Sequence, residues 1–128
     1  MAVLFGTFSG VSYAESSKAC DESWDDNGVN CTIRHWNDHV NGTLASKGSF
    51  TSYDEVVAAS DHYADGLGVY IKAEDSYTGQ YIEKWVTGGK GDSWKKNASF
   101  PDGRFIDLKV CQTNNGTLMN CLFAEARA

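Results

Sequence analysis

Apolar and polar residues alternate one by one along several short segments of this chain. The alternation is clearest in residues 66–74, 80–86 and 104–111, where an extended backbone would separate the side chains into two distinct faces. A period of two with many β-branched and aromatic residues is typical of strands that bury one face. Residues 31–36 and 43–51 show the pattern less regularly. The sequence therefore predicts an all-β protein built from short strands.

Residues 52–60 leave two interpretations open. Ser52, with Glu55 three residues later, matches the start of a capped helix. The run of small apolar residues from Val56 onward suits a strand equally well, because so short a run fits either period.

Asn-Gly and Asp-Gly pairs occur repeatedly between these segments. Such pairs adopt positive φ at low cost and suit two-residue hairpin turns. The clearest predicted hairpin joins residues 104–112 to residues 117–126 through a turn at 113–116. Frequent turns between about six to eight short strands favour a small antiparallel β-sandwich.

Four cysteines fall into two close pairs, and neither pair has the C-x-x-C spacing of a zinc site. Three disulfide connectivities are possible. We favour the two local bridges, which close short loops and would each stabilise the fold by roughly 3 kcal/mol on chain-entropy grounds. The alternative is four reduced thiols in a cytosolic core. The favoured bridges are Cys20–Cys31 and Cys111–Cys121.

Residues 1–14 carry no charged side chain and end in Ser12-Tyr13-Ala14, which places small residues at the −3 and −1 positions of a cleavage site before Glu15. This segment is predicted to be the remnant of a signal peptide, although the positive n-region is missing. Alternatively it forms an N-terminal strand, since Phe5, Val11 and Tyr13 would share a face. Residues 15–128 are expected to form one domain, secreted into an oxidising environment.

Composition narrows the range of partners. The formal net charge is −6 and the pI is near 4.9, whereas binding to nucleic acid or to an anionic membrane rewards clustered Lys and Arg. No apolar run approaches the roughly 20 residues that span a bilayer. We therefore expect neither a nucleic-acid partner nor membrane insertion.

The second half of the chain carries a pattern made by residues 60–66, the strand 69–71, Trp85, the Asp102-Gly103 turn, residues 109–111 and Cys121. This pattern resembles small secreted proteins of Streptomyces and related actinobacteria. Some of those proteins look like the adaptor subunits of secreted antibacterial toxin particles, which link a lectin subunit to a large repeat-bearing subunit. The resemblance implies a disulfide-bonded β-sandwich without catalysis, whose extended N-terminal segment adds as a strand to a larger partner. It carries over no functional residue.

Two segments resemble metal sites. His35 and His39 would share a helix face, but Trp36 stands where a zinc protease needs its Glu, and on a strand the two would lie about 13 Å apart. We expect solvated histidines beside a turn. The acidic loop around residues 21–28 does not fit an EF-hand, because Arg34 takes the place of the bidentate Glu. A weaker calcium site involving Asp21, Asp25 or Asp26 stays open, and no metal or other cofactor is predicted.

Two further patterns bear on catalysis. Paired carboxylates for glycoside hydrolysis could come from Asp61, Asp65, Glu74 and Asp75, which the sequence cannot place relative to one another. Residues 88–93 are rich in glycine but lack the spacing of a phosphate loop, so we expect a flexible hairpin loop. No nucleophile elbow occurs, and no cysteine is spare. We therefore predict that the chain is not an enzyme.

Four tryptophans in so short a chain supply candidate binding residues, either as a platform for sugar stacking or at a protein interface. Core packing is the alternative. The leading hypothesis is a secreted interaction module that binds a protein partner, and the second is a carbohydrate-binding module. A small hydrolase and a protease inhibitor rank below both. The candidate aromatic residues are Trp24, Trp36, Trp85 and Trp94.

Overall fold

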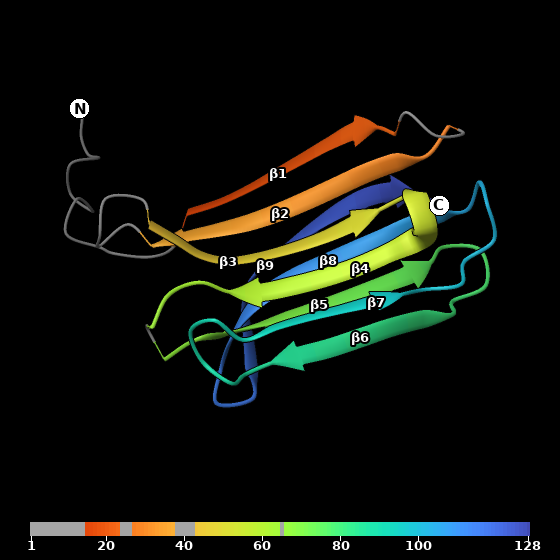
Figure 1. The fold of residues 1–128 in the computed structure, drawn as a ribbon. Coiled ribbons are helices and arrows are strands. Elements are labelled where there is room, and N and C mark those ends of the chain that lie inside the picture. The colour runs from red at the N-terminus through yellow and green to blue at the C-terminus, as the bar shows by residue number, and fades with distance from the viewer. Residues whose placement is uncertain (1–14, 24–26, 38–42, 65) are drawn as a thin grey trace, which may run out of the picture.

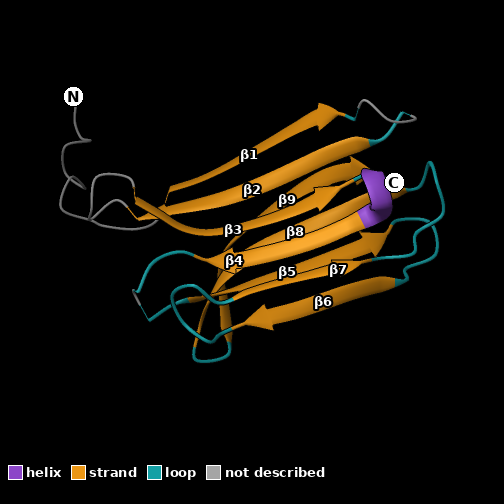
Figure 2. Ribbon diagram, viewed as in Figure 1, coloured by secondary structure: helices purple, strands orange, loops and turns teal. Residues whose placement is uncertain are grey.

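The structure, a computed structural model, describes residues 15–23, 27–37, 43–64 and 66–128. Every strand pairing among them is antiparallel, and the one helical element is a short 3-10 turn, η3, at Tyr53–Glu55 (Figure 2). The all-β prediction is confirmed. The strands are β1 Glu15–Glu22, β2 Val29–Asn37, β3 Thr43–Thr51, β4 Val56–Asp61, β5 Gly68–Asp75, β6 Tyr81–Val86, β7 Ser93–Asn97, β8 Phe105–Asn114 and β9 Thr117–Arg127.

The strands form one sheet that folds over on itself into two layers (Figure 1). Its order is β6-β5-β8-β9-β2-β3-β4-β7, and β1 pairs with β2 outside this path. We call β1-β2-β3-β4-β7 the first layer and β6-β5-β8-β9 the second layer. A single backbone pair, Val29 with Arg127, joins β2 to β9. The predicted sandwich is thus confirmed, in a form that nearly closes into a barrel.

The core lies between the two layers and follows the alternation seen in the sequence. Val69, Ile71 and Ala73 on β5 have no exposed surface, and the same holds for Ile106 and Leu108 on β8. On the first layer the inward side chains come from β2, β3 and β4. The largest fully buried apolar side chains are Phe50, Ile33, Ile71, Ile106, Leu108, Val57, Val69, Val86 and Val110.

Gly48, in the middle of β3, lets the two layers come close together. A Cβ built on Gly48 would lie 2.6 Å from one methyl of Val110 and 3.1 Å from Cδ1 of Ile71, both on the second layer. Real Cβ atoms do not approach that closely, so the absence of a side chain is what makes room for these two core residues. Glycine within a strand commonly marks such a close approach.

The β8–β9 hairpin confirms the clearest turn of the sequence. Asn115 and Gly116 have φ of 50° and 84°, as a two-residue type I′ turn requires. The strands reach further into the turn than predicted, because residues 113 and 114 still pair with residues 118 and 117. A bulge between Val110 and Gln112 shifts the register near Asn120, whose φ is 53°.

Both predicted disulfides are present and link neighbouring strands. Cys20 lies directly opposite Cys31 across β1 and β2, and Cys111 bonds to Cys121 beside the β8–β9 bulge. The Cα atoms are 4.1 Å apart in each pair. No described cysteine is free. The first bridge ties β1, whose side chains from Ser16 to Glu22 are exposed, to the buried strand β2.

The two open interpretations of residues 52–60 both hold in part. The 3-10 turn η3 comes first, with positive φ at Asp54 and Glu55, and β4 follows from Val56. The Ser52 side chain makes no capping hydrogen bond, so the helix start signal produced only a turn.

Residues 1–14 lie outside the described residues, so the signal-peptide remnant stays a prediction. Among the described residues, no helix has the length and apolar character that crossing a bilayer requires.

Gly48→Ala is expected to destabilise the protein by about 1–3 kcal/mol, the usual cost of overpacking a dense core. Chemical denaturation of the purified protein measures this change. Val110→Ala in the same chain should recover part of the loss, since it removes the methyl groups that the new Cβ meets. Ser49→Ala, the neighbouring residue on the other face of β3, is the control. Equal stability of Gly48→Ala and Ser49→Ala would contradict this account of the core.

Replacing either cysteine pair by alanine should lower the free energy of unfolding by about 3 kcal/mol, because the bridges close loops of similar length. The two variants should differ in native-state hydrogen exchange. Cys20→Ala/Cys31→Ala should speed exchange chiefly in β1, which pairs with β2 alone among the described strands. Cys111→Ala/Cys121→Ala should speed exchange around the β8–β9 bulge. Identical exchange maps for the two variants would contradict these separate roles.

Candidate binding surfaces

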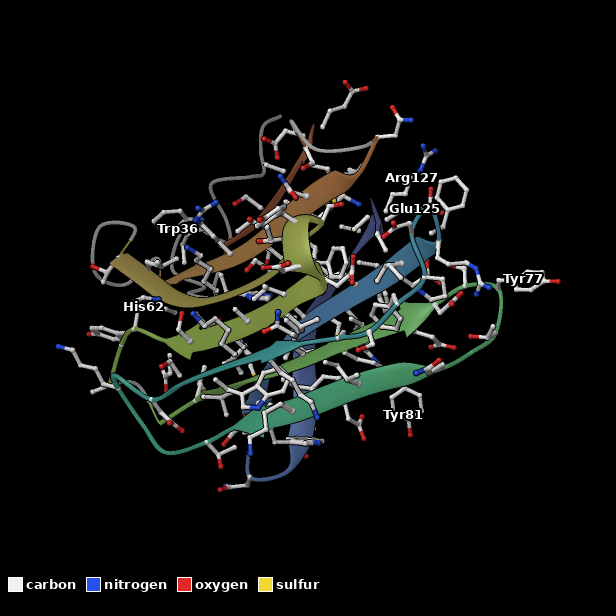
Figure 3. All side chains as sticks on the ribbon, turned by 45° about the vertical axis from the view of Figure 1, so that its right-hand side comes forward. Trp36, His62, Tyr77, Tyr81, Glu125 and Arg127 are labelled. Carbon is white, nitrogen blue, oxygen red and sulfur yellow. A yellow bond between two sulfur atoms is a disulfide. The ribbon has the colours of Figure 1, made fainter. Side chains whose placement is uncertain are left out.

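The tryptophans that the sequence singled out do not form one platform. Trp24 lies outside the described residues. Trp94 on β7 packs against the core, while Trp85 on β6 is 38 % exposed on the outside of the second layer. Trp36 on β2 is half-buried, and its indole N–H lies 3.4 Å from Oγ of Ser17 on β1 (Figure 3). The three described indoles therefore do not share a face.

His35 is fully buried between the layers, so the expectation of a solvated histidine was wrong for this residue. It occupies an inward position of β2, beside Ile33 and opposite Ser46 on β3. His39 lies outside the described residues. The two-histidine metal site is therefore not placed by the structure.

A polar network surrounds the buried His35. Its Nε2 lies 2.5 Å from the backbone oxygen of Asn120, and its Nδ1 lies 3.4 Å from Oγ of Ser46. These partners fit the neutral tautomer in which Nε2–H donates and Nδ1 accepts. The Asn120 side chain in turn donates to Oε1 of Gln112 at 2.7 Å. His35 and Ser46 are buried between the layers and line neither of the two hollows described below, so we assign the Ser–His contact a structural role.

Burial lowers the pKa of His35, and the hydrogen bond with the Asn120 carbonyl opposes this shift in part. The imidazole is therefore held neutral at physiological pH. A charged form would leave a cation between two apolar layers, which is costly.

The carboxylates considered for glycoside hydrolysis are not brought together. Asp61 ends β4 and Asp75 ends β5, so the two lie at opposite ends of the sandwich. Glu74 faces outward, whereas its neighbour Asp75 faces inward. Asp65 lies outside the described residues. The pairing that hydrolysis requires does not exist among the three described members of this set.

Asp75 has a structural role instead. Its carboxylate accepts hydrogen bonds from the backbone amides of Tyr77 and Thr78 at 2.8 and 3.3 Å, and from Arg104 at 2.6 Å. Desolvation by itself would raise the pKa of Asp75, but these amides and the guanidinium together lower it. The ion pair fixes the β5–β6 turn against the start of β8.

The structure describes only some of the residues considered for a weak calcium site. Asp21 is exposed on β1, and Asp25 and Asp26 lie outside the described residues. No cluster of three His, Cys, Asp or Glu side chains suited to a metal ion occurs in the described ranges. The glycine-rich loop joins β6 to β7, which pair with β5 and β4 and not with each other, so the expected hairpin loop is instead a connection between the two layers. The Asp92 carboxylate accepts a hydrogen bond from the Gly88 amide at 2.9 Å.

The outward side of the second layer, which we call the outer face, brings together aromatic and charged side chains that lie far apart in the sequence. Register places Lys72 of β5 beside Lys109 of β8, and Lys109 beside Phe123 of β9. One step along, Glu74 is beside Asp107, and Asp107 is beside Glu125. A basic row and an acidic row therefore run next to each other across three strands.

Aromatic rings frame these rows. Phe123 is 56 % exposed, Tyr81 50 % and Phe105 45 %. Cations lie over their faces: Lys72 over Tyr81 at 4.6 Å and Arg127 over Phe105 at 4.7 Å. Such contacts hold both partners in place and leave the ring edges in solvent.

Between the rows, a groove of about 440 Å³ crosses the outer face, and the ring of Phe123 forms part of it. Lys18 of β1 closes one side by donating from Nζ to the backbone oxygen of Phe123 at 2.8 Å. Further along the same layer, burial and a hydrogen bond to Glu83 raise the pKa of Tyr70, which therefore stays protonated. The other residues lining the groove are Lys72, Glu74, Asp107, Lys109, Ala124 and Glu125.

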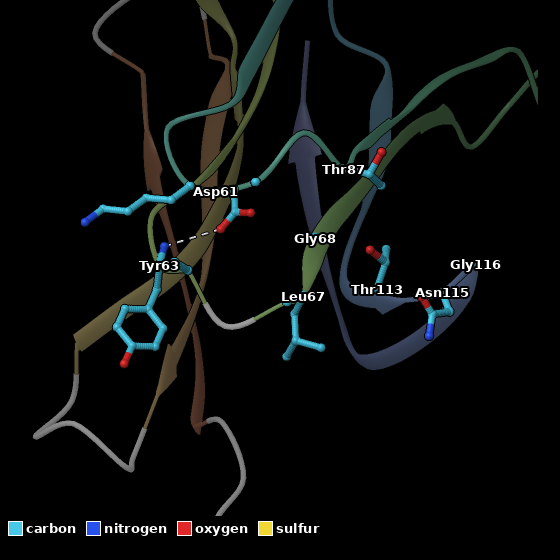
Figure 4. Close-up of a pocket in the computed structure, with 12 residues that line it drawn as sticks. Asp61, Tyr63, Leu67, Gly68, Thr87, Thr113, Asn115 and Gly116 are labelled. Atoms are coloured by element: carbon cyan, nitrogen blue, oxygen red, sulfur yellow. Dashed lines mark hydrogen bonds between the residues drawn. The ribbon is translucent and has the colours of Figure 1, made fainter.

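A second hollow, the mouth pocket, opens at one end of the sandwich and measures about 530 Å³ (Figure 4). The β4–β5 connection, the β6–β7 connection and the β8–β9 turn meet around it. Its polar lining includes Asp61, Tyr63, Thr87, Thr113 and Asn115.

Sequence reasoning missed both surfaces. In the sequence, the residues of the outer face appear only as the second of the two side-chain faces of each alternating segment, the face that does not pack in the core. The signal that could have found them was the aromatic and charged character of that half in residues 80–86 and 104–111. Their assembly depends on strand order, which the sequence pattern does not state.

Comparison with known proteins adds no relative: no family model, curated protein or solved structure matches the chain.

The lowered pKa of His35 predicts that the protein loses stability as the pH falls below about 6.5. In that range His35 is protonated in the unfolded chain but stays neutral in the folded chain. The free energy of unfolding therefore falls with a slope of at most about 1.4 kcal/mol per pH unit. The loss ends below the folded-state pKa. Denaturation at a series of pH values between 5 and 8 measures it.

His35→Gln should flatten this slope, at a cost in stability at neutral pH. His62→Gln, which removes an exposed histidine, is the matched control and should keep the slope. An unchanged slope in His35→Gln would show that His35 is not the group responsible.

Proposed function

We propose that this protein is a secreted, non-catalytic binding module that holds a partner protein on its outer face. The observation that supports this proposal is the gathering of exposed rings on one side of the second layer, with Phe123 and Phe105 about half exposed. An interaction surface typically centres on such aromatic side chains surrounded by polar ones.

The arrangement of charge favours a protein over other partners. Lys72 and Lys109 lie beside Glu74, Asp107 and Glu125, so both signs occur in adjacent rows. A phosphate backbone or an anionic lipid surface would meet the acidic row unfavourably. A protein surface can present opposite charges in matching rows, which supports specificity and rapid association.

The acidic row also suits binding better than catalysis. Asp107 accepts a hydrogen bond from Ser76 at 3.1 Å, and Glu74 pairs with Lys72 at 3.1 Å. These carboxylates lie on an open sheet face, where nothing excludes water from a reacting bond.

Two disulfides fit an oxidising environment, which is consistent with secretion. The role of adaptor subunit within a toxin particle, implied by the resemblance of residues 60–121, stays a prediction. The carbohydrate-binding alternative stays a prediction, and the described tryptophans Trp36, Trp85 and Trp94 do not support a shared stacking platform because they do not share a face.

Phe105→Ser/Phe123→Ser is expected to weaken partner binding about 10- to 100-fold, the loss typical of removing two interfacial rings. The oxidised full-length protein, carrying a tag, is used to recover partners from the culture medium of the producing organism. The partner is then identified and purified, and its affinity for each variant is measured by interferometry. Both rings are solvent-exposed, so the variant should keep its fold.

Tyr53→Ser is the matched control, because Tyr53 is 50 % exposed but lies on η3, away from the outer face. It should bind as the unaltered protein does. Equal affinity of the double variant and the control would reject the outer face as the binding surface. Recovery of the protein alone, with no stoichiometric partner, would reject the function itself.

A further inference from the structure

The mouth pocket is a site separate from the outer face, built where three connections meet. Asp61 at the end of β4 and Thr87 after β6 both line it (Figure 4). The β8–β9 turn supplies Asn115, and Thr113 comes from the end of β8. A volume of about 530 Å³ lies within the range of small-molecule sites.

Backbone hydrogen bonds fix Asp61 in its position. Its amide donates to the oxygen of Asp92 at 2.9 Å, and its own carbonyl accepts from the Gly91 amide at 2.8 Å. The Tyr63 amide donates to Oδ1 of Asp61 at 3.3 Å. Asp61 as a whole is 3 % exposed, yet it forms part of the pocket lining. A carboxylate held this firmly is preorganised to accept hydrogen bonds from a ligand in the pocket.

The opposite wall is equally well defined. Thr113 is 3 % exposed, and a Cβ on Gly68 would lie 2.6 Å from its hydroxyl oxygen. The lack of a side chain at Gly68 thus leaves room for that hydroxyl. Asn115 is held by the type I′ turn, which requires its φ of 50°. Its amide can both donate and accept.

The lining chemistry selects among ligand classes. A carboxylate, an amide and two threonine hydroxyls offer acceptors and donors at several points, while Tyr63 and Leu67 add apolar surface. A divalent cation would need more carboxylate ligands than the described lining holds. Lys90 also lines the pocket and would attract a phosphate, but the Asp61 carboxylate offsets that attraction. A ring that carries several hydroxyl groups and has an apolar C–H face matches all of these groups at once.

We propose that the mouth pocket binds a pyranose sugar, with the Asp61 carboxylate accepting hydrogen bonds from neighbouring hydroxyl groups of the ring. Asn115 and the hydroxyls of Thr87 and Thr113 contact the remaining polar edges, and the ring's C–H face packs on Tyr63 or Leu67. This inference does not rest on the proposed protein partner, since the two surfaces use different residues. The sugar could be free or the terminal residue of a glycan.

Titration of the ¹⁵N-labelled full-length protein tests the proposal by chemical-shift mapping. The probes are glucose, galactose, mannose, N-acetylglucosamine and glucosamine, each taken to about 50 mM to reach millimolar affinities. Short oligosaccharides ending in these residues distinguish a free sugar from a glycan end. Sorbitol, an open-chain polyol, is the negative probe. Saturable shifts at Asp61, Thr87 and Thr113 with at least one sugar, and none with sorbitol, are expected.

Two variants make the result specific to the pocket. Asn115→Gly keeps a residue suited to positive φ in the turn while removing the amide, and Asp61→Asn removes the charge at the opposite wall. Asp61→Asn should weaken binding at least about tenfold, because a charged and buried hydrogen-bond acceptor is lost. Asn115→Gly should weaken it about two- to tenfold, because Asn115 is exposed and its hydrogen bond is a neutral one. If Asp61→Asn fails to fold, Asn115→Gly decides alone.

Tyr77→Ser, an 83 % exposed ring on the β5–β6 turn, is the control and should leave binding unchanged. Absence of saturable shifts with the whole panel would overturn the proposal. Shifts that persist unchanged in Asn115→Gly, or that occur away from the pocket, would overturn it as well.

Discussion

The junction between β2 and β9 is the place where the two layers must be held together. Along the rest of the described sheet, each pair of neighbouring strands is joined by at least five backbone pairs, but here the ladder consists of one pair, Val29 with Arg127. Side chains act in its place: His35 contacts the carbonyl of Asn120, and Lys18 donates to the carbonyl of Phe123. A sheet that folds over can bury both inner faces only if this junction stays closed.

This constraint explains why a histidine is buried in a core that is otherwise largely apolar. The β8–β9 bulge gives Asn120 a positive φ and places its carbonyl within reach of His35. The buried imidazole needs a partner for its N–H, because an unpaired polar group inside the core would cost stability. The Asn120 carbonyl supplies that partner while the ring fills the space of a large core residue. Ser46 completes the histidine's second hydrogen bond from the first layer.

The two proposed binding surfaces both follow from the same architecture. Because the inner faces are used for packing, the outward half of each alternating strand is available for partners, and strand order decides which outward residues meet. The mouth pocket forms at the end of the sheet, where the loops between strands no longer pair with one another. Loops held by a rigid scaffold are a common place for ligand sites. Gly48 and Gly68 support this arrangement in different ways, one by bringing the layers together and one by leaving room for Thr113.

Local pattern predicted most of the strands, the β8–β9 hairpin and both disulfides, but it gave no signal for β1 or β7. These features depend on residues close in sequence: alternation sets which side chains face inward, Asn115-Gly116 sets the turn, and cysteines ten or eleven positions apart pair across neighbouring strands. Tertiary structure alone decided that His35 is buried, that the tryptophans divide between core and surface, and that Lys72, Lys109 and Phe123 form one row. The physical reason is that strand order and register bring together residues dozens of positions apart, and a period of two is the same whichever strand lies alongside.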